Sequence, residues 1–142
     1  CDLVVAAESS YFLLAFRRIG LVPDGGSSLL VPARVGFARA AEMAMLGERV
    51  GARQALDWGL INQVWPDGEL AERAGDLLVR LADGPTRSYA GTKRQLNSWL
   101  YQRMEEQLEL EAQIQQEMAA SGDFEEGLKA FADKRQPRFS GG

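Results

Sequence analysis

The sequence predicts a mixed α/β protein whose second half is wholly helical. Short apolar runs bounded by turn signals occur at residues 3–7, 11–13 and 60–65, which is typical of buried strands. After Pro66 the apolar residues instead recur at helical spacing. We therefore expect a partial α/β core over residues 1–65, which would carry the active-site turn, and a helical region over residues 66–142.

Three helices are expected between the strands of the first half, at residues 27–31, 37–46 and 52–58. Pro32 and Gly36 should separate the first two, because proline removes a backbone donor and glycine disfavours helix. Gly47 and Gly59 follow the second and third, in the position where glycine commonly ends a helix.

In the second half, the segment Pro66-Asp67-Gly68 should begin a helix that ends at Asp83-Gly84-Pro85. From Thr86 onward the pattern predicts helix throughout, with a last helix at residues 123–135. One apolar stripe should run along this region opposite a solvated acidic face, which is typical of a core or of a subunit interface. The stripe consists of Leu96, Leu100, Met104, Leu108, Ile114 and Met118.

Composition excludes several kinds of site. The chain of 142 residues has no histidine, which rules out Ser-His-Asp catalysis and His-ligated zinc and leaves carboxylates, lysine and tyrosine for proton transfer. A net charge of −4 argues against a broad nucleic-acid surface. The lone cysteine, Cys1, cannot form an internal disulfide.

No apolar run approaches the roughly 20 residues that span a bilayer, and no leader pattern is evident, so we expect a cytoplasmic protein without a membrane span. The chain begins at Cys1, without methionine, and enters an apolar strand directly. We therefore expect it to be the C-terminal portion of a longer protein.

Residues 15–28 contain the most informative stretch, which sets one carboxylate, Asp24, between apolar residues and a Gly-Gly pair. Pro23 fixes its own φ and biases Val22 toward extended backbone, and the two glycines permit backbone angles closed to other residues. Such a corner would aim an acid into an apolar cavity, as general acid–base catalysis requires. Asp24 could instead cap the helix that begins near Gly25, because aspartate is a preferred N-cap residue. The local sequence leaves both interpretations open.

Four segments, in order, resemble the crotonase (enoyl-CoA hydratase/isomerase) family. They are C-D-L-V-V-A-A at residues 1–7, I-G-L-V-P-D-G-G at 19–26, L-G-E-R-V-G-A-R-Q-A-L-D-W-G-L-I-N-Q-V at 46–64 and D-F-E-E-G-L-K-A-F-A-D-K-R-Q-P-R-F at 123–139. The resemblance implies the C-terminal part of a spiral of ββα turns, followed by a helical region that forms a homotrimer or a dimer of trimers. It also implies an acyl-CoA substrate, no separate cofactor and no metal, with an oxyanion hole on segments that precede Cys1.

The resemblance also bears on the reaction. Hydratases of the family use two glutamates, and one of these positions is occupied here by Ala15-Phe16, which cannot transfer a proton. Asp24 matches the acidic position of Δ3,Δ2-enoyl-CoA isomerases and of the ring-opening isomerase of phenylacetate degradation. Moving a double bond needs one base, so the resemblance implies an isomerase with Asp24 as that base.

By the same resemblance, one set of residues would line the acyl pocket and another would reach the nucleotide end of coenzyme A bound to a neighbouring subunit. The acyl-pocket set is Phe16, Leu21, Val22, Pro23 and Gly25, and the nucleotide-end set is Phe131 and Lys134. Core packing of Phe131 and a favourable helix-dipole contact of Lys134 remain open. Two other functions also remain open: a hydratase that uses an upstream glutamate, and a non-catalytic or truncated family member that serves in assembly.

Overall fold

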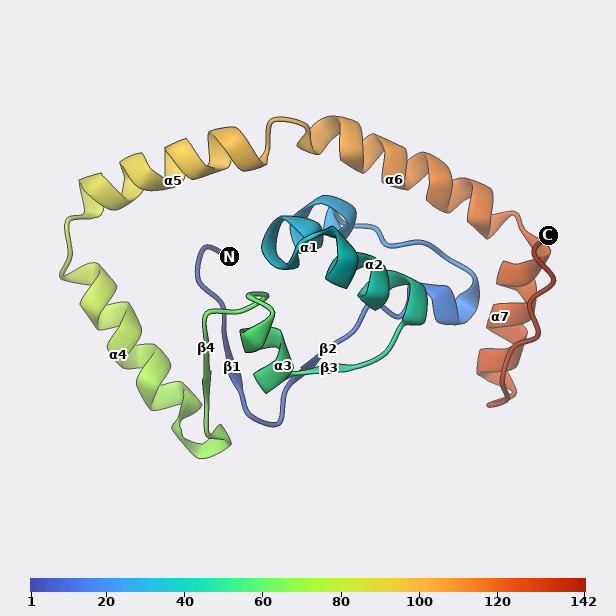
Figure 1. The fold of residues 1–142 in the computed structure, drawn as a ribbon, viewed down its shortest axis with the longest axis horizontal. Helices are drawn as coiled ribbons and strands as arrows, with labels where there is room; N and C mark the ends of the chain where they lie inside the picture. The colour runs from blue at the N-terminus through green and yellow to red at the C-terminus, as the bar shows by residue number, and fades with distance from the viewer. The chain divides into compact units, whose positions relative to one another are not determined.

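The computed structural model describes residues 1–142 as short strands and helices (Figure 1). Their contacts divide the chain into two compact units. Unit 1 comprises residues 1–12 and 50–103, and unit 2 comprises residues 13–49 and 104–142. The mixed α/β class is confirmed, and most of the ordered residues are helical. Each unit combines residues from both sides of Pro66. The expected division of the chain into a core region before Pro66 and a helical region after it stays a prediction.

The strands of unit 1 form two short pairs. Strand β1 (Val5–Ala7) is parallel to β4 (Gln63–Trp65), with Val5 opposite Gln63 and Ala7 opposite Trp65 (Figure 1). Strand β2 (Tyr11–Phe12) is antiparallel to β3 (Val50–Gly51). The three predicted strands are present but shorter than predicted. Strand β3 was not predicted, because two residues are too few to show an alternating pattern.

Four helical elements complete unit 1. Helix α3 (Ala52–Asp57) packs against β2, β3 and β4, and buries Ala52 and Ala55 almost completely. A 3₁₀ turn, η2 (Asp67–Glu69), precedes α4 (Leu70–Ala82), and α5 (Thr86–Leu100) follows. The predicted helices at residues 52–58 and after Pro66 are therefore confirmed, each to within a few residues.

Unit 2 contains the 3₁₀ turn η1 (Phe16–Ile19) and helices α1 (Ser27–Val35), α2 (Phe37–Leu46), α6 (Met104–Ala119) and α7 (Gly122–Ala132). Helix α1 packs against α2 and α6, and α7 packs against η1. No helix in the structure is both long enough and apolar enough to cross a membrane.

Two predicted helix boundaries are wrong. Helix α1 continues through Pro32 to Val35, because a proline at that position removes only one intrahelical hydrogen bond. The helix ends at Gly36, which has φ 79° and ψ 164°. The helix predicted to continue from Thr86 stops at Leu100, and α6 begins at Met104. The predicted apolar stripe is therefore divided between two helices in different units.

Gly127 lies buried in α7, where this helix meets η1. A Cβ atom at Gly127 would lie 2.6 Å from Ile19 Cα and 2.7 Å from Ile19 C, which is closer than real carbon atoms approach. The absence of a side chain at Gly127 therefore sets how near α7 comes to the backbone of η1.

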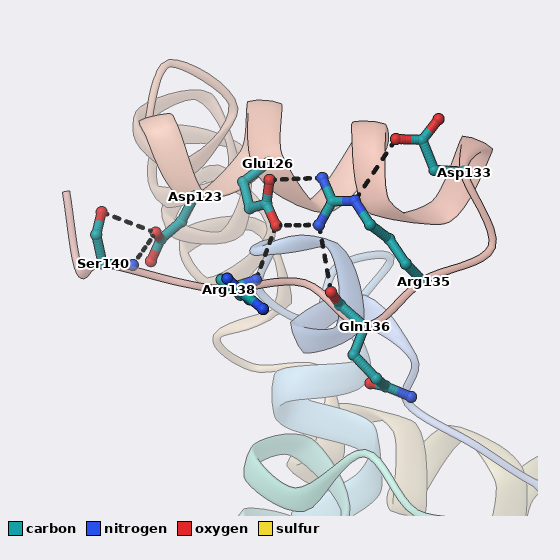
Figure 2. A network of polar contacts seen from close by, with 7 residues as sticks. All are labelled: Asp123, Glu126, Asp133, Arg135, Gln136, Arg138 and Ser140. Atoms are coloured by element: carbon teal, nitrogen blue, oxygen red, sulfur yellow. Dashed lines mark hydrogen bonds and ion pairs between the residues drawn. The ribbon is translucent and has the colours of Figure 1, made fainter.

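The chain turns back after α7 and returns along this helix (Figure 2). The Arg135 guanidinium forms a bidentate ion pair with Glu126, with Nη1–Oε1 and Nη2–Oε2 distances of 2.6 and 2.9 Å. The Arg138 backbone N–H also donates to Glu126 Oε1, at 2.8 Å. Nearer the terminus, the Ser140 backbone N–H donates to Asp123 Oδ1 at 2.7 Å. Two carboxylates of α7 thus fasten the C-terminal tail to it.

We expect Gly127→Ala to lower the free energy of unfolding by about 1–3 kcal/mol, because the added methyl group must push apart two backbone segments. Gly91→Ala is the matched control, since a Cβ at Gly91, within α5, would meet nothing within 4 Å. That control should be neutral or stabilising by up to about 1 kcal/mol. Denaturant unfolding monitored by circular dichroism would test both variants. Equal effects would contradict the close approach of α7 to η1.

Stability should also depend on pH through Glu126. The Arg135 hydrogen bond, with help from the Arg138 backbone N–H, lowers the pKa of Glu126 from 4.5 to about 2. Because the folded-state pKa is the lower one, the ionised carboxylate stabilises the folded protein above pH 4.5, and this stabilisation is lost as the pH falls towards 2.

Glu126→Gln should therefore lower the melting temperature at neutral pH, and the difference from the wild type should shrink to nothing by about pH 2. Melting curves at a series of pH values would measure this convergence. Glu125→Gln, a neighbouring exposed position that leaves the Glu126–Arg135 pair intact, should keep the pH dependence of the wild type. A gap that stays constant with pH would argue against the ion pair.

Candidate active site

The turn that carries Asp24 is built from glycines in the left-handed backbone region. Gly20 ends η1 with φ 73°, and Gly25 and Gly26 have φ values of 65° and 82°. Such angles are rare for residues with a side chain, so this turn requires the Gly-Gly pair. A Cβ at Gly25 would meet nothing within 4 Å. Backbone conformation, and not lack of space, therefore makes glycine necessary there.

Asp24 does not cap the helix that follows. Helix α1 begins at Ser27 with Gly26 as its N-cap residue, and no side chain of that segment caps it. Asp24 contacts the start of α1 only through its backbone carbonyl, which accepts from the Ser27 backbone N–H at 3.1 Å. The capping interpretation of Asp24 is therefore wrong.

Glu111, from α6, occupies the N-terminus of α1 instead. Its Oε2 accepts from the Gly26 backbone N–H at 2.7 Å, and its Oε1 accepts from the Ser28 backbone N–H at 3.0 Å and from the Ser28 hydroxyl. The side chain is buried, at 4 % exposure. A carboxylate in this position is favourable because it satisfies free N–H groups at the positive end of the helix dipole.

The acidic face expected from the sequence consists of Glu105, Glu106, Glu109 and Glu117, and no role was predicted for Glu111. A signal was available, since position 111 falls three residues after Leu108 and seven after Met104, on the apolar stripe itself. A carboxylate on the buried face of a helix requires hydrogen-bond donors there.

Asp24 itself is exposed and contacts α6 through one oxygen. Gln115 Nε2 donates to Asp24 Oδ2 at 3.1 Å, and Gln115 Oε1 accepts from the Val22 backbone N–H at 3.2 Å. The turn thus presents a single carboxylate that is held at one oxygen.

The predicted acyl-pocket residues all fall on this segment of unit 2. Gly25 is exposed at the apex of the turn, and the other four residues are half-buried. Their proposed contact with an acyl chain stays a prediction. The half-buried residues are Phe16, Leu21, Val22 and Pro23.

The two predicted coenzyme A contacts lie at the end of α7. The Phe131 side chain is 77 % exposed, so it does not pack in the core of this chain. Lys134 is exposed two residues after the helix ends, with φ 53°. Phe131 lies on a groove of about 500 Å³, which is also lined by Arg17, Arg18, Leu46, Gly47, Glu48, Arg135, Gln136, Pro137 and Phe139.

Two arginines in that groove also hold the end of α2. Arg18 donates from Nε and Nη2 to the Gly47 carbonyl at 3.1 and 2.7 Å, and Arg17 Nη1 donates to the Leu46 carbonyl at 2.8 Å. Cationic groups at the C-terminus of a helix complement its dipole. The groove therefore combines an exposed aromatic ring with fixed positive charge.

Comparison with known proteins identifies relatives along the whole chain. A family model described as enoyl-CoA hydratase/isomerase matches residues 1–142. A probable enoyl-CoA hydratase of Rhodobacter capsulatus is 41 % identical over 140 residues, which cover 99 % of this chain and 54 % of the relative. The 1,2-epoxyphenylacetyl-CoA isomerase of Escherichia coli is also 41 % identical, with 99 % of this chain and 53 % of the relative covered.

Solved structures agree with these relatives. An enoyl-CoA hydratase from Mycobacterium avium subsp. paratuberculosis matches with a TM-score of 0.93 and 42 % identity, covering 99 % of this chain and 57 % of that one. An enoyl-CoA hydratase/isomerase from Pseudoalteromonas atlantica matches with a TM-score of 0.91 and 34 % identity, covering 99 % and 56 %. The crotonase-type fold is therefore confirmed.

The chain spans about half the length of the curated relatives that it matches. Within that span the match is continuous, since the family model runs from the first residue to the last and the relatives align over 140 residues. The four segments singled out in the sequence all lie inside it. The chain therefore belongs to the enoyl-CoA hydratase/isomerase family.

Proposed function

We propose that the protein containing this chain is an isomerase that moves a double bond in an acyl-CoA thioester, with Asp24 as its single acid–base group. The observation that carries this proposal is the isolation of Asp24 at the Gly25–Gly26 turn. Gln115 occupies one of its carboxylate oxygens, and the other, Oδ1, accepts no protein hydrogen bond. A carboxylate held in this way is oriented and still free to exchange a proton.

The proposed reaction transfers one proton out and back. The Asp24 carboxylate removes a proton from C2 of a 3-enoyl thioester, and the electron pair of the C–H bond forms an enolate at the thioester carbonyl. The protonated carboxyl group then returns the proton at C4, which leaves the double bond between C2 and C3. No water enters, so one carboxylate is sufficient. By family resemblance, the donors that stabilise the enolate oxygen lie on segments outside this chain.

The surroundings of Asp24 favour isomerisation over hydration. Adding water requires two proton transfers at different atoms, and therefore a second acid–base group. Phe16 stands where the family pattern of hydratases has a glutamate. Glu111 is near in the fold, but its two oxygens are occupied by backbone and hydroxyl donors. One relative that is 41 % identical is a 1,2-epoxyphenylacetyl-CoA isomerase, which supports this choice.

A hydratase that uses an upstream glutamate is the second candidate, because another relative of equal identity is a probable enoyl-CoA hydratase. The two candidates differ in what they require of Asp24. Hydration by an upstream glutamate would tolerate the loss of the Asp24 carboxylate, and isomerisation would not.

We also propose that the exposed end of α7 binds the nucleotide part of coenzyme A. Phe131 offers a flat ring to an adenine, and Lys134 and the arginines of the groove offer positive charge to phosphates. By family resemblance this ligand would belong to a neighbouring subunit of a trimer or a dimer of trimers.

Asp24→Asn in the complete protein should reduce the isomerase kcat by about 10²–10⁴-fold, the usual contribution of a general acid–base group. Conversion of a 3-enoyl-CoA to its conjugated 2-enoyl isomer can be followed by ultraviolet absorbance. Asp57→Asn, which also removes one exposed carboxylate, should retain wild-type turnover. If Asp24→Asn stays within about tenfold of the wild type, Asp24 is not the base.

Phe131→Ala and Lys134→Ala should raise the KM for an acyl-CoA several-fold and leave kcat nearly unchanged, because they remove binding distant from the reacting atoms. The same variants should match the wild type on a pantetheine thioester, which lacks the nucleotide. Leu128→Ala, an exposed apolar position on the same helix, serves as the control. Equal losses on both substrates would show that α7 does not contact the nucleotide.

A further inference from the structure

Three side chains of α6 bind the Asp24 turn from one face of the helix. Gln107, Glu111 and Gln115 are spaced four residues apart and therefore project from the same side. Gln107 Nε2 donates to Ser28 Oγ at 2.8 Å, Glu111 accepts from the Gly26 and Ser28 backbone N–H groups, and Gln115 contacts Val22 and Asp24. We name these three residues the α6 ladder.

The orientation of the Gln115 amide follows from its two partners. The Val22 backbone N–H can only donate, so it must face the amide oxygen. The amide nitrogen is then directed at Asp24 Oδ2, at 3.1 Å. Because the acceptor side is fixed by the backbone, Gln115 offers Asp24 a donor in a defined position.

We propose that Gln115 is a positioning residue, which holds the Asp24 carboxylate in the orientation that proton transfer requires. This inference rests on the proposed role of Asp24. An exposed aspartate samples several rotamers, and a carboxylate displaced by about 1 Å can lose roughly 10²-fold in rate. A neutral amide restrains one oxygen without placing a full charge beside the base, and it leaves Oδ1 without a protein hydrogen bond.

Replacing Gln115 separates its two hydrogen bonds. Gln115→Glu keeps an oxygen to accept from the Val22 backbone N–H, but it replaces the donor to Asp24 by a second carboxylate that repels it. Gln115→Met removes both contacts with a side chain of similar length. If Gln115 only tethered the backbone at Val22, Gln115→Glu would keep its activity and Gln115→Met would not.

Both variants should lower the isomerase kcat by about 10–100-fold with KM within about threefold of the wild type, since only the orientation of the base changes. Gln113→Glu is the matched control, because Gln113 is exposed on the same helix and donates to Glu109 at 2.8 Å. That control should retain full turnover. Melting curves would verify that all variants are folded. A folded Gln115→Glu or Gln115→Met protein with a kcat within about threefold of the wild type would overturn the inference.

The double variant Asp24→Asn/Gln115→Glu distinguishes the two proposals. If Gln115 acts through Asp24, the double variant should be no slower than Asp24→Asn alone. An additional tenfold loss in the double variant would show that Gln115 acts elsewhere and would reject the positioning role. Failure of the proposed function is detected separately, as an active Asp24→Asn single variant.

Discussion

The buried Glu111 carboxylate at the start of α1 is the interaction on which the candidate site depends. It joins two segments more than 80 residues apart in the sequence, since its partners are Gly26 and Ser28. A carboxylate buried without donors would be strongly unfavourable, and so would two helix N–H groups left unpaired, at about 1–3 kcal/mol each. Each half of this contact therefore requires the other. Because Glu111 of α6 accepts hydrogen bonds from the backbone N–H groups at the start of α1, it also fixes the position of the Gly-Gly turn that carries Asp24.

The buried apolar residues of unit 2 are Val35, Ala40, Met43 and Ala130. Close approach of backbone segments and hydrogen bonds also join the elements of this unit. Gly127 lets α7 meet the backbone of η1, the two arginines of η1 hold the end of α2, and the Glu126–Arg135 pair fastens the tail (Figure 2). Glycine and charge thus help to position the elements around the turn.

Much of the fold follows from local signals, and the exceptions have physical reasons. Strand β1, helix α4 and the break at Gly36 were predicted, because apolar periodicity and glycine act within a few residues. Two features were not predicted. Helix α1 passes through Pro32, because tertiary contacts can override local propensity. Helix α5 ends at Leu100, where no proline or glycine marks the position.

In the candidate site, the turn at Gly25 and Gly26 was predicted, the alternative role of Asp24 as a helix cap was wrong, and its catalytic role stays a prediction. The residue that caps α1 lies 85 positions after Gly26, and single-sequence patterns carry no information about such a partner. Pairing Glu111 with free N–H groups requires knowing that α6 packs on α1. The position of Glu111 on the apolar stripe predicts that it is buried, but not where its donors lie.

The two carboxylates near the turn, Glu111 and Asp24, differ in their hydrogen-bond partners and therefore in the roles open to them. Glu111 is buried and its oxygens accept from two backbone N–H groups and one hydroxyl, so a proton would displace contacts that hold the helix. Asp24 is exposed and accepts one hydrogen bond from a neutral amide, so gaining a proton at Oδ1 breaks nothing. One acid is therefore committed to the fold and the other is available for chemistry. Under the proposed function, this one exposed carboxylate would remove a proton from the substrate and return it.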